Sequence, residues 1–215
     1  MKKEHSFIFD LDGTLTNTLP LSLSGSKETI KRIAGKDITK KEIYKHFGKT
    51  ENALFIDVLG NKWEDGVRYY AHYFEKRVDK EIVFEGIFDV LEFLKARGLK
   101  TGLVTGRGPS STEVILRKTG LGAYFDTVKT GSVYKDVKTR CIKEVMAAWH
   151  VRPSRVFYLG DAASDVADAK AARVGALSAA WFINADKKAQ AAQKPLKIFD
   201  TVAEFYSWLK DNIAE

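Results

Sequence analysis

Short apolar runs that stop abruptly at glycine and aspartate are the feature that most constrains how this chain folds. Apolar runs of this length, bounded by turn residues, are typical of strands buried on both faces of a sheet. The clearest runs, each with the turn that follows, are Ser6 to Phe9 before Asp10-Leu-Asp-Gly, Leu99 to Val104 before Thr105-Gly-Arg-Gly-Pro, and Arg155 to Leu159 before Gly160-Asp161. Weaker strand candidates are Phe125 to Lys129, Ala176 to Phe182 and Leu196 to Phe199.

Helical patterns separate these runs from residue 85 onward. Ile87, Val90, Leu91 and Leu94 repeat at the spacing of one helix face. Ser110 and Glu113 predict a capping box that opens a helix just after Pro109. Strands that alternate with helices favour a parallel sheet covered on both faces. The predicted fold is therefore α/β, a doubly wound, Rossmann-like parallel sheet.

Residues 19–83 break this alternation, because they show only helical signals. Thr39 and Glu42 predict a capping box, and a stripe of large apolar residues follows one helical face farther on. The members of that stripe are Trp63, Val67, Tyr70, Phe74 and Val78. We therefore expect a small helical cap domain at 19–83, inserted into a core domain made of 1–18 and 84–215. Two hinge segments are expected, near Asn17 to Pro20 and near Ile82 to Gly86.

Composition excludes several classes of protein. The 215 residues contain a single cysteine, Cys141, so no intrachain disulfide is possible and a reducing cytoplasm is expected. The apolar run after the basic N-terminus stops at Asp10, too early for a secretory signal, and no stretch reaches the roughly 20 apolar residues of a membrane span. The net charge of +7 is concentrated in residues 27–49, where eight Lys and Arg face three Asp and Glu. A solvated helix face or an anion-attracting surface explains this segment.

Acidic residues follow two of the predicted strands. Asp10 and Asp12 follow the first, and Asp161 and Asp165 follow the run that ends at Leu159. The carboxyl ends of parallel strands meet in one crevice, so the four carboxylates are expected to converge there. Their mutual repulsion predicts a bound hard cation such as Mg²⁺, which is commonly shared between carboxylates and a phosphate. A phosphate ester is therefore the expected substrate.

The residue types suggest how such an ester is cleaved. Asp10 is the expected nucleophile, because a carboxylate can attack phosphorus and form an aspartyl-phosphate that water hydrolyses. Asp12 is placed to act as general acid toward the leaving group and then as base toward water. Thr105 and Gly106 offer a hydroxyl and a backbone N–H to the phosphate oxygens. A lysine is still required to neutralise the transferred group.

These residues resemble the haloacid dehalogenase superfamily of phosphatases and mutases. Its four motifs are matched in order by Asp10-Leu-Asp-Gly-Thr-Leu, Val104-Thr-Gly, a lysine ahead of the fourth strand, and Gly160-Asp-Ala-Ala-Ser-Asp. The resemblance spans nearly the whole chain and is strongest to phosphoglycolate phosphatase-like members with a helical cap. It implies that Asp10, the backbone carbonyl of Asp12 and Asp161 hold Mg²⁺, with Asp165 binding directly or through water. Thr14 is typical of the phosphatases rather than the mutases.

The third motif departs from the family pattern, which usually reads Lys-Pro. The candidates are Lys135 and Lys138, neither followed by proline, and Lys138 is favoured because it directly precedes a predicted helix. Asn17 stands where relatives commonly have aspartate. The family's substrate-selecting cap loop corresponds best to His46-Phe-Gly-Lys-Thr, in which Lys49 is expected to reach an anionic substituent of the substrate.

The sequence thus predicts a cytoplasmic, Mg²⁺-dependent phosphatase that acts on a small phosphorylated metabolite such as phosphoglycolate or a sugar phosphate. Two alternatives remain: a phosphomutase of the β-phosphoglucomutase type, and a non-catalytic relative whose basic segment binds phosphate or nucleic acid. Because all four acidic residues and the threonines are present, a nucleic-acid partner is disfavoured. No membrane association is expected, and the oligomeric state is not indicated.

Overall fold

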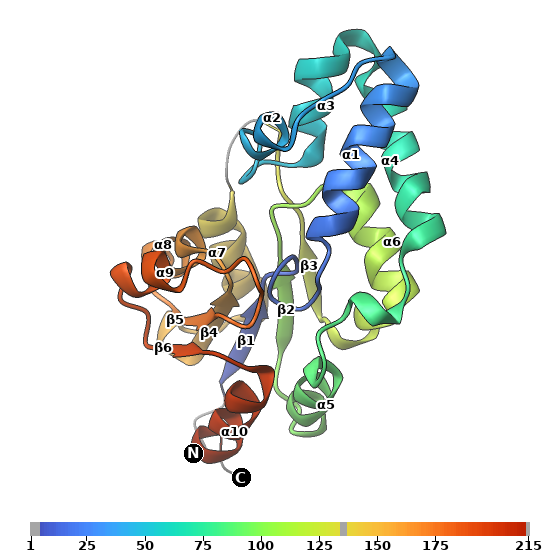
Figure 1. The fold of residues 1–215 in the computed structure, drawn as a ribbon. Coiled ribbons are helices and arrows are strands. Elements are labelled where there is room, and N and C mark those ends of the chain that lie inside the picture. The colour runs from blue at the N-terminus through green and yellow to red at the C-terminus, as the bar shows by residue number, and fades with distance from the viewer. Residues whose placement is uncertain (1–4, 134–136, 214–215) are drawn as a thin grey trace.

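A parallel sheet forms the centre of the structure, a computed structural model that describes residues 5–133 and 137–213 (Figure 1). Within those ranges six strands pair in the order β3-β2-β1-β4-β5-β6, and all are parallel. They are β1 (Ser6–Phe9), β2 (Thr101–Val104), β3 (Thr127–Lys129), β4 (Val156–Gly160), β5 (Gly175–Ala179) and β6 (Lys197–Phe199). Parallel neighbours need crossover connections, which helices supply here. The predicted α/β, Rossmann-like class is confirmed.

All six strands lie within or next to the predicted ranges, but the run at Ala176 to Phe182 is shortened. β5 ends at Ala179, where its pairing with β6 also ends. The apolar residues after Ala179 lie outside the sheet. Among them, Trp181 donates its indole N–H to the carbonyl of Thr14, in the loop after β1, at 3.0 Å. An apolar run therefore does not by itself fix the end of a strand.

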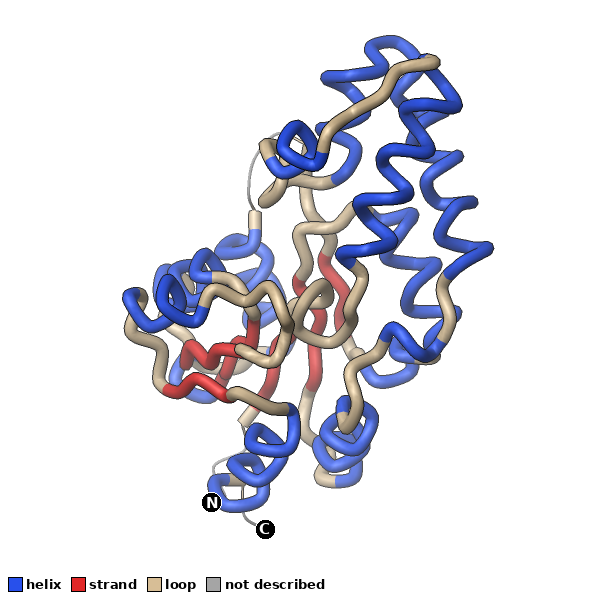
Figure 2. Tube along the Cα trace, in the orientation of Figure 1, coloured by secondary structure: helices blue, strands red, loops and turns tan. Residues whose placement is uncertain are grey.

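Helices cover both faces of the sheet (Figure 2). Along β1, Phe7 and Phe9 belong to one apolar cluster and Ile8 to another, as the two-residue period of a strand requires. The core helices are α5 (Ile87–Ala96), α6 (Pro109–Thr119), α7 (Lys138–Trp149), α8 (Ala163–Ala171), α9 (Lys187–Ala192) and α10 (Val202–Asn212). Those with side chains in the cluster of Phe7 and Phe9 are α5, α6 and α10, while α7 and α8 contribute to the cluster of Ile8. The two clusters make the sheet a buried central layer.

Four helices between β1 and α5 form the helical insertion, which lies beyond one end of the sheet (Figure 1). They are α1 (Leu19–Ala34), α2 (Lys40–Tyr44), α3 (Glu51–Leu59) and α4 (Trp63–Arg77). The chain segments that enter and leave the insertion lie side by side, since the Asn17 N–H donates to the Ile82 carbonyl at 2.7 Å and Thr16 pairs with Val83. The insertion also packs on the core through α4 and α6. Its division from the core at residues 18/19 and 83/84 stays a prediction.

The two predicted capping boxes had different outcomes. That of α2 is confirmed, because Thr39 and Glu42 exchange side-chain and backbone hydrogen bonds. That of α6 is wrong: the N-cap is Gly108, two residues before Ser110, and the helix begins at Pro109. The Gly108 N–H instead donates to the carboxylate of Glu51, on the helical insertion, at 2.8 Å. A carboxylate distant in sequence thus replaces the local Ser110–Glu113 pair.

In the described parts of the chain, each helix is either too short or too polar to cross a bilayer.

Candidate active site

The carboxyl ends of β1, β2 and β4 open into a cavity of about 720 Å³ that lies between the sheet and the helical insertion. From β1 the chain adds β2 and β3 on one side of β1 and then crosses to add β4, β5 and β6 on the other side. The loops diverge where the strand order reverses, and α/β sheets commonly bind ligands at such a position. The predicted site residues that line this cavity are Asp10, Asp12, Lys49, Thr105, Gly106, Lys138 and Asp161. Residues from three strand ends and from the insertion therefore share one cavity.

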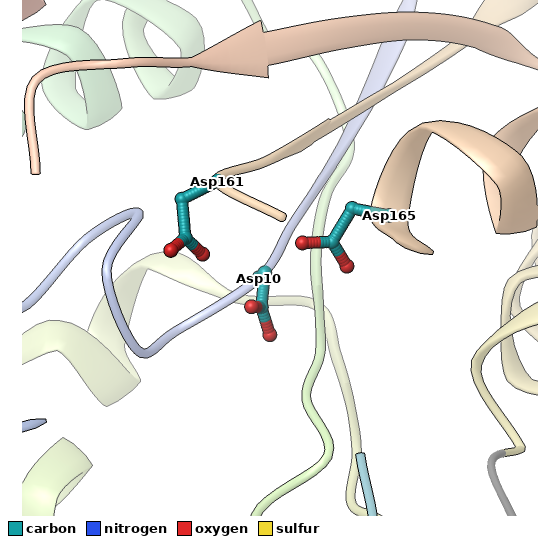
Figure 3. A group of neighbouring side chains, drawn as sticks. All are labelled: Asp10, Asp161 and Asp165. Atoms are coloured by element: carbon teal, nitrogen blue, oxygen red, sulfur yellow. The ribbon is translucent and has the colours of Figure 1, made fainter. Parts of the chain in front are cut away.

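Three carboxylates lie close together (Figure 3), of which Asp10 and Asp161 line the cavity and Asp165 is buried beside them. Asp10 follows β1, Asp161 follows β4, and Asp165 lies in the first turn of α8; one oxygen from each lies within 4.8 Å of the others. Gly13 passes over Asp161 with a φ of +79°, and a Cβ at Gly13 would overlap the Asp161 carboxylate. Glycine is therefore required in the turn after β1 both by backbone conformation and by space.

The carboxylates of this cluster are crowded and shielded from water. Burial, together with the charges of Asp165 and Asp12, raises the pKa of Asp10 to about 7 against the opposing effect of Lys138. Burial and the charges of Asp10 and Asp165 raise the pKa of Asp161 well above its ordinary value. Asp10 Oδ1 is buried and has no hydrogen-bond partner among the described residues. An orphaned carboxylate oxygen beside two further acids fits a hard divalent cation, because oxygen ligands are what Mg²⁺ prefers.

Lys138 is the basic group of this cluster. Its Nζ lies 3.1 Å from Asp10 Oδ2 and 2.6 Å from Asp165 Oδ1, and it begins α7. Burial alone would lower the pKa of Lys138, but the charges of Asp10 and Asp165 outweigh it and raise the pKa well above the ordinary value. The lysine therefore stays charged beside the expected nucleophile. The other candidate, Lys135, lies outside the described residues.

Tyr158 is a site residue that sequence reasoning missed. Its hydroxyl, fully buried on β4, lies 3.2 Å from both the Val104 carbonyl and Asp165 Oδ1. Asp165 also accepts the Ala162 N–H at 3.0 Å. Protein donors thus occupy both oxygens of Asp165, which fixes its orientation in the cluster. A tyrosine within an apolar strand carries no sequence signal that distinguishes it from an ordinary core residue.

The Asp12 side chain lies outside the acidic cluster, which corrects the expectation that four carboxylates converge. It turns instead toward Arg107, whose Nη2 lies 2.7 Å from Asp12 Oδ1 and whose Nε lies 3.0 Å from Oδ2, and it also accepts a hydrogen bond from Thr18. The physical reason is the guanidinium, which sequence reasoning had not assigned to the site. Burial alone would raise the pKa of Asp12, but Arg107 and the hydrogen bonds hold it below its ordinary value.

The expected phosphate-binding residues lie beside the cluster. Thr105 is buried, and its hydroxyl oxygen accepts the Arg107 N–H at 3.1 Å. Gly106 lies close to Lys138, since a Cβ there would be 3.9 Å from the lysine Cε. Thr14 donates to Asp161 Oδ1 at 3.3 Å. Lys49 lies across the cavity on the helical insertion, where it is exposed, after a turn in which Gly48 has a φ of +88°.

Comparisons with known proteins agree with this arrangement. Residues 7–179 match the family described as haloacid dehalogenase-like hydrolase. Pyrophosphatase PpaX of Bacillus velezensis is 25% identical over 185 residues, which cover 85% of this chain and 86% of that protein. PpaX of Bacillus mycoides is 22% identical over 205 residues, with 94% and 95% covered.

Solved structures share the fold. A predicted phosphoglycolate phosphatase from Haemophilus somnus superposes with a TM-score of 0.81 at 20% identity, covering 98% of this chain and all of that one. CbbY from Rhodobacter sphaeroides, in complex with xylulose-(1,5)bisphosphate, superposes with a TM-score of 0.78 at 18% identity, covering 94% and 96%. The match to the family extends over most of the chain. It includes the positions of all four motifs, which are 10–15, 104–106, Lys138 and 160–165. The chain belongs to the haloacid dehalogenase-like hydrolase family.

Proposed function

We propose that this chain is a Mg²⁺-dependent phosphatase that cleaves a small phosphate ester through an aspartyl-phosphate at Asp10. The observation that supports this most strongly is the state of Asp10: one carboxylate oxygen contacts Lys138, and the other is buried without a hydrogen-bond partner among the described residues. A buried, unsatisfied oxygen is costly to folding, so its retention indicates a function.

The residues present fit a magnesium ion. Asp10, Asp161 and the backbone carbonyl of Asp12 would hold it, with Asp165 acting through water, because protein donors already occupy both Asp165 oxygens. When bound, the ion would neutralise charge on the phosphoryl oxygens. This ligand set is our proposal.

The chain's own groups then supply the steps. An Asp10 carboxylate oxygen attacks phosphorus, the bond from phosphorus to the leaving oxygen breaks, and that oxygen takes a proton from Asp12. Water next attacks the aspartyl-phosphate while Asp12 removes its proton, which releases phosphate and regenerates Asp10. Lys138, Thr105 and Gly106 line the same cavity and would balance the charge of the transferred group. The helical insertion lines one side of the cavity and would limit the access of bulk water during transfer.

The substrate class is a small phosphorylated metabolite. The names of the similar proteins point to pyrophosphate, phosphoglycolate and a sugar bisphosphate as compounds for a first panel. We also propose that the protein acts in the cytoplasm and has no nucleic-acid partner.

The test is Asp10→Asn assayed with p-nitrophenyl phosphate and Mg²⁺. Asparagine preserves size but cannot form the acyl phosphate, so we expect activity to fall below detection while circular dichroism stays unchanged. Undiminished phosphate release by this variant would overturn the assignment. Chromatography of sugar phosphates after incubation distinguishes a mutase, which interconverts isomers with little release of phosphate. Salt-sensitive retention of DNA or RNA without any phosphatase activity would indicate the non-catalytic alternative.

A further inference from the structure

Arg107 is a buried cation at the cavity that the reaction proposed above does not use. It follows Thr105 and Gly106 after β2, its side chain is only 5% exposed, and it lines the cavity. Its guanidinium lies over the Phe74 ring, 4.8 Å from the centroid, and contacts the insertion through Ser22 Oγ at 2.6 Å and the Tyr70 hydroxyl at 3.5 Å. Arg107 thus occupies the side of the cavity that faces the helical insertion.

The N–H donors of Arg107 outnumber the hydrogen bonds that they make to the described residues. A guanidinium has five N–H donors in a fixed plane. Nε and one N–H of Nη2 donate to Asp12, the second N–H of Nη2 donates to Ser22, and Nη1 makes a single long contact to Tyr70. One Nη1 donor therefore lacks an acceptor among the described residues. The planar fork of arginine suits an incoming phosphate or carboxylate.

The charge balance of Arg107 depends on Asp12. Asp12 is its only ion-pair partner within the described parts of the chain. The charge of Glu51 also acts on Arg107, but the Glu51 carboxylate is hydrogen-bonded to Gly108 and Ser111 at the start of α6. In the proposed reaction Asp12 is protonated before it serves the leaving oxygen, and a protonated Asp12 no longer balances the charge of Arg107. A buried guanidinium that loses its counter-ion is strongly unfavourable. A substrate that supplies a replacement anion would remove this penalty.

We propose that Arg107 binds an anionic group carried by the leaving group, so that the preferred substrate is a phosphate ester or anhydride with a second negative charge close to the bridging oxygen. This inference rests on the proposed function. The anion is a carboxylate or a phosphate, since both match the guanidinium fork. In this proposal Arg107, and not the exposed Lys49, binds the anionic substituent of the substrate. Lys138 is not available for that role, because it contacts Asp10 and Asp165.

The first experiment uses the unaltered protein. With Mg²⁺, kcat/KM is measured for phosphoglycolate and for its methyl ester, which carries the same phosphoryl group on an uncharged leaving group. We expect the charged compound to be preferred by about 100-fold, the effect of one desolvated charge pair. Equal turnover of the two would overturn the role of Arg107 while leaving the phosphatase intact. Failure to hydrolyse p-nitrophenyl phosphate and every other ester would instead overturn the proposed function and, with it, this inference.

The second experiment compares Arg107→Gln with Arg117→Gln. Arg117 lies on the outer part of α6, is 57% exposed and pairs with Glu75 of the insertion, so it is a matched arginine outside the cavity. We expect Arg107→Gln to abolish the preference for phosphoglycolate over its methyl ester, and Arg117→Gln to preserve it. Arg107→Lys retains the positive charge, so we expect it to keep part of the preference for phosphoglycolate. This variant also tests the proposal if Arg107→Gln does not fold. An unchanged preference in folded Arg107→Gln contradicts the proposal.

Inorganic pyrophosphate distinguishes the two kinds of anion. If Arg107→Gln lowers kcat/KM for pyrophosphate more than for phosphoglycolate, the natural leaving group carries phosphate. The opposite order identifies a carboxylate. Arg107→Gln could also lower kcat/KM for pyrophosphate and phosphoglycolate by no more than it lowers kcat/KM for the neutral methyl ester. That result would show that Arg107 acts only on Asp12 and would overturn the inference.

Discussion

Asp10 and Asp12 are two residues apart, yet they lie in opposite electrostatic surroundings. Asp10 faces the sheet side of the cavity, where burial and the charges of Asp165 and Asp12 raise its pKa to about 7 against the opposing effect of Lys138. Asp12 faces the insertion side, where Arg107 and Thr18 overcome burial and lower its pKa. These directions describe the site without a metal ion and oppose the proposed roles, because attack needs an ionised Asp10 and proton donation needs a protonated Asp12. A bound divalent cation would lower the pKa of Asp10 and favour its ionised form. The expected nucleophile therefore contacts Lys138, whereas the expected acid and base contacts Arg107.

The lysine on the sheet side gives the largest expected effect. Lys138→Ala removes the cation that contacts Asp10 and Asp165, so we expect kcat/KM for p-nitrophenyl phosphate to fall about 1000-fold. Lys135→Ala serves as the matched variant, because Lys135 is the other candidate for the same role. A larger loss for Lys135→Ala would reassign the third motif to Lys135. It would also contradict the role of the Lys138 charge beside Asp10 and Asp165.

Asp12→Asn tests the insertion side. Loss of the general acid is expected to lower kcat about 100-fold for an alkyl phosphate, whose leaving oxygen needs a proton, and much less for p-nitrophenyl phosphate, whose leaving group is stable as an anion. The measurement is the ratio of kcat values for the two esters in each protein. An equal loss for both esters would mean that Asp12 serves another purpose, and the comparison of the two aspartates would fail.

Metal and pH sharpen the comparison without an activity assay. The pKa values of Asp10 and Asp161 are raised on folding, so the folded protein binds more protons, and without metal its stability is expected to fall as pH rises from about 4 toward 7. Asp12 acts in the opposite sense, since its lowered pKa adds stability that is lost at acidic pH.

In EDTA we therefore expect a lower melting temperature at pH 7.5 than at pH 5, with Mg²⁺ restoring about 5 °C at pH 7.5 and little at pH 5. Asp161→Asn is expected to raise the melting temperature in EDTA and to remove the response to Mg²⁺. A response to Mg²⁺ that is the same at both pH values, or that persists in Asp161→Asn, would refute a metal site at this cluster.

The smallest expected effect concerns the contact between the insertion and α6. Glu51→Gln weakens the hydrogen bonds to Gly108 and Ser111, so we expect it to lower the free energy of unfolding by about 1–2 kcal/mol. Glu64→Gln is the control, because Glu64 lies in the first turn of α4 and is exposed. Chemical denaturation compares the two variants. Equal, negligible losses would show that the Glu51 contact does not hold the insertion against the core.

Sequence patterns predicted the elements better than the contacts between them. Ser6 to Phe9 forms β1 with the predicted bounds, because an apolar run stopped by Asp10 leaves little freedom. The start of α6 was misplaced, because the N–H of its N-cap, Gly108, donates to Glu51, 57 positions away in sequence. Lys138 was favoured over Lys135 by its place before a helix, and in the structure it contacts Asp10.

Arg107 marks the limit of that reasoning. Its neighbours Thr105 and Gly106 were selected because they follow a strand, but a single arginine in a loop is ordinarily a surface charge. Its burial results from Phe74 and Tyr70, which come from a helix of the insertion. These rings come from α4, which packs against α6, the helix that begins two residues after Arg107.

The sequence by itself determined the parallel sheet, the helical insertion and the carboxylates at strand ends, because hydrophobic periodicity and turn residues act over a few positions along the chain. Tertiary structure alone decided which carboxylates share a cluster, which cation each of them faces and how far burial shifts each pKa. Those properties depend on distances between groups far apart in sequence and on the exclusion of water, and neither is encoded in any local pattern.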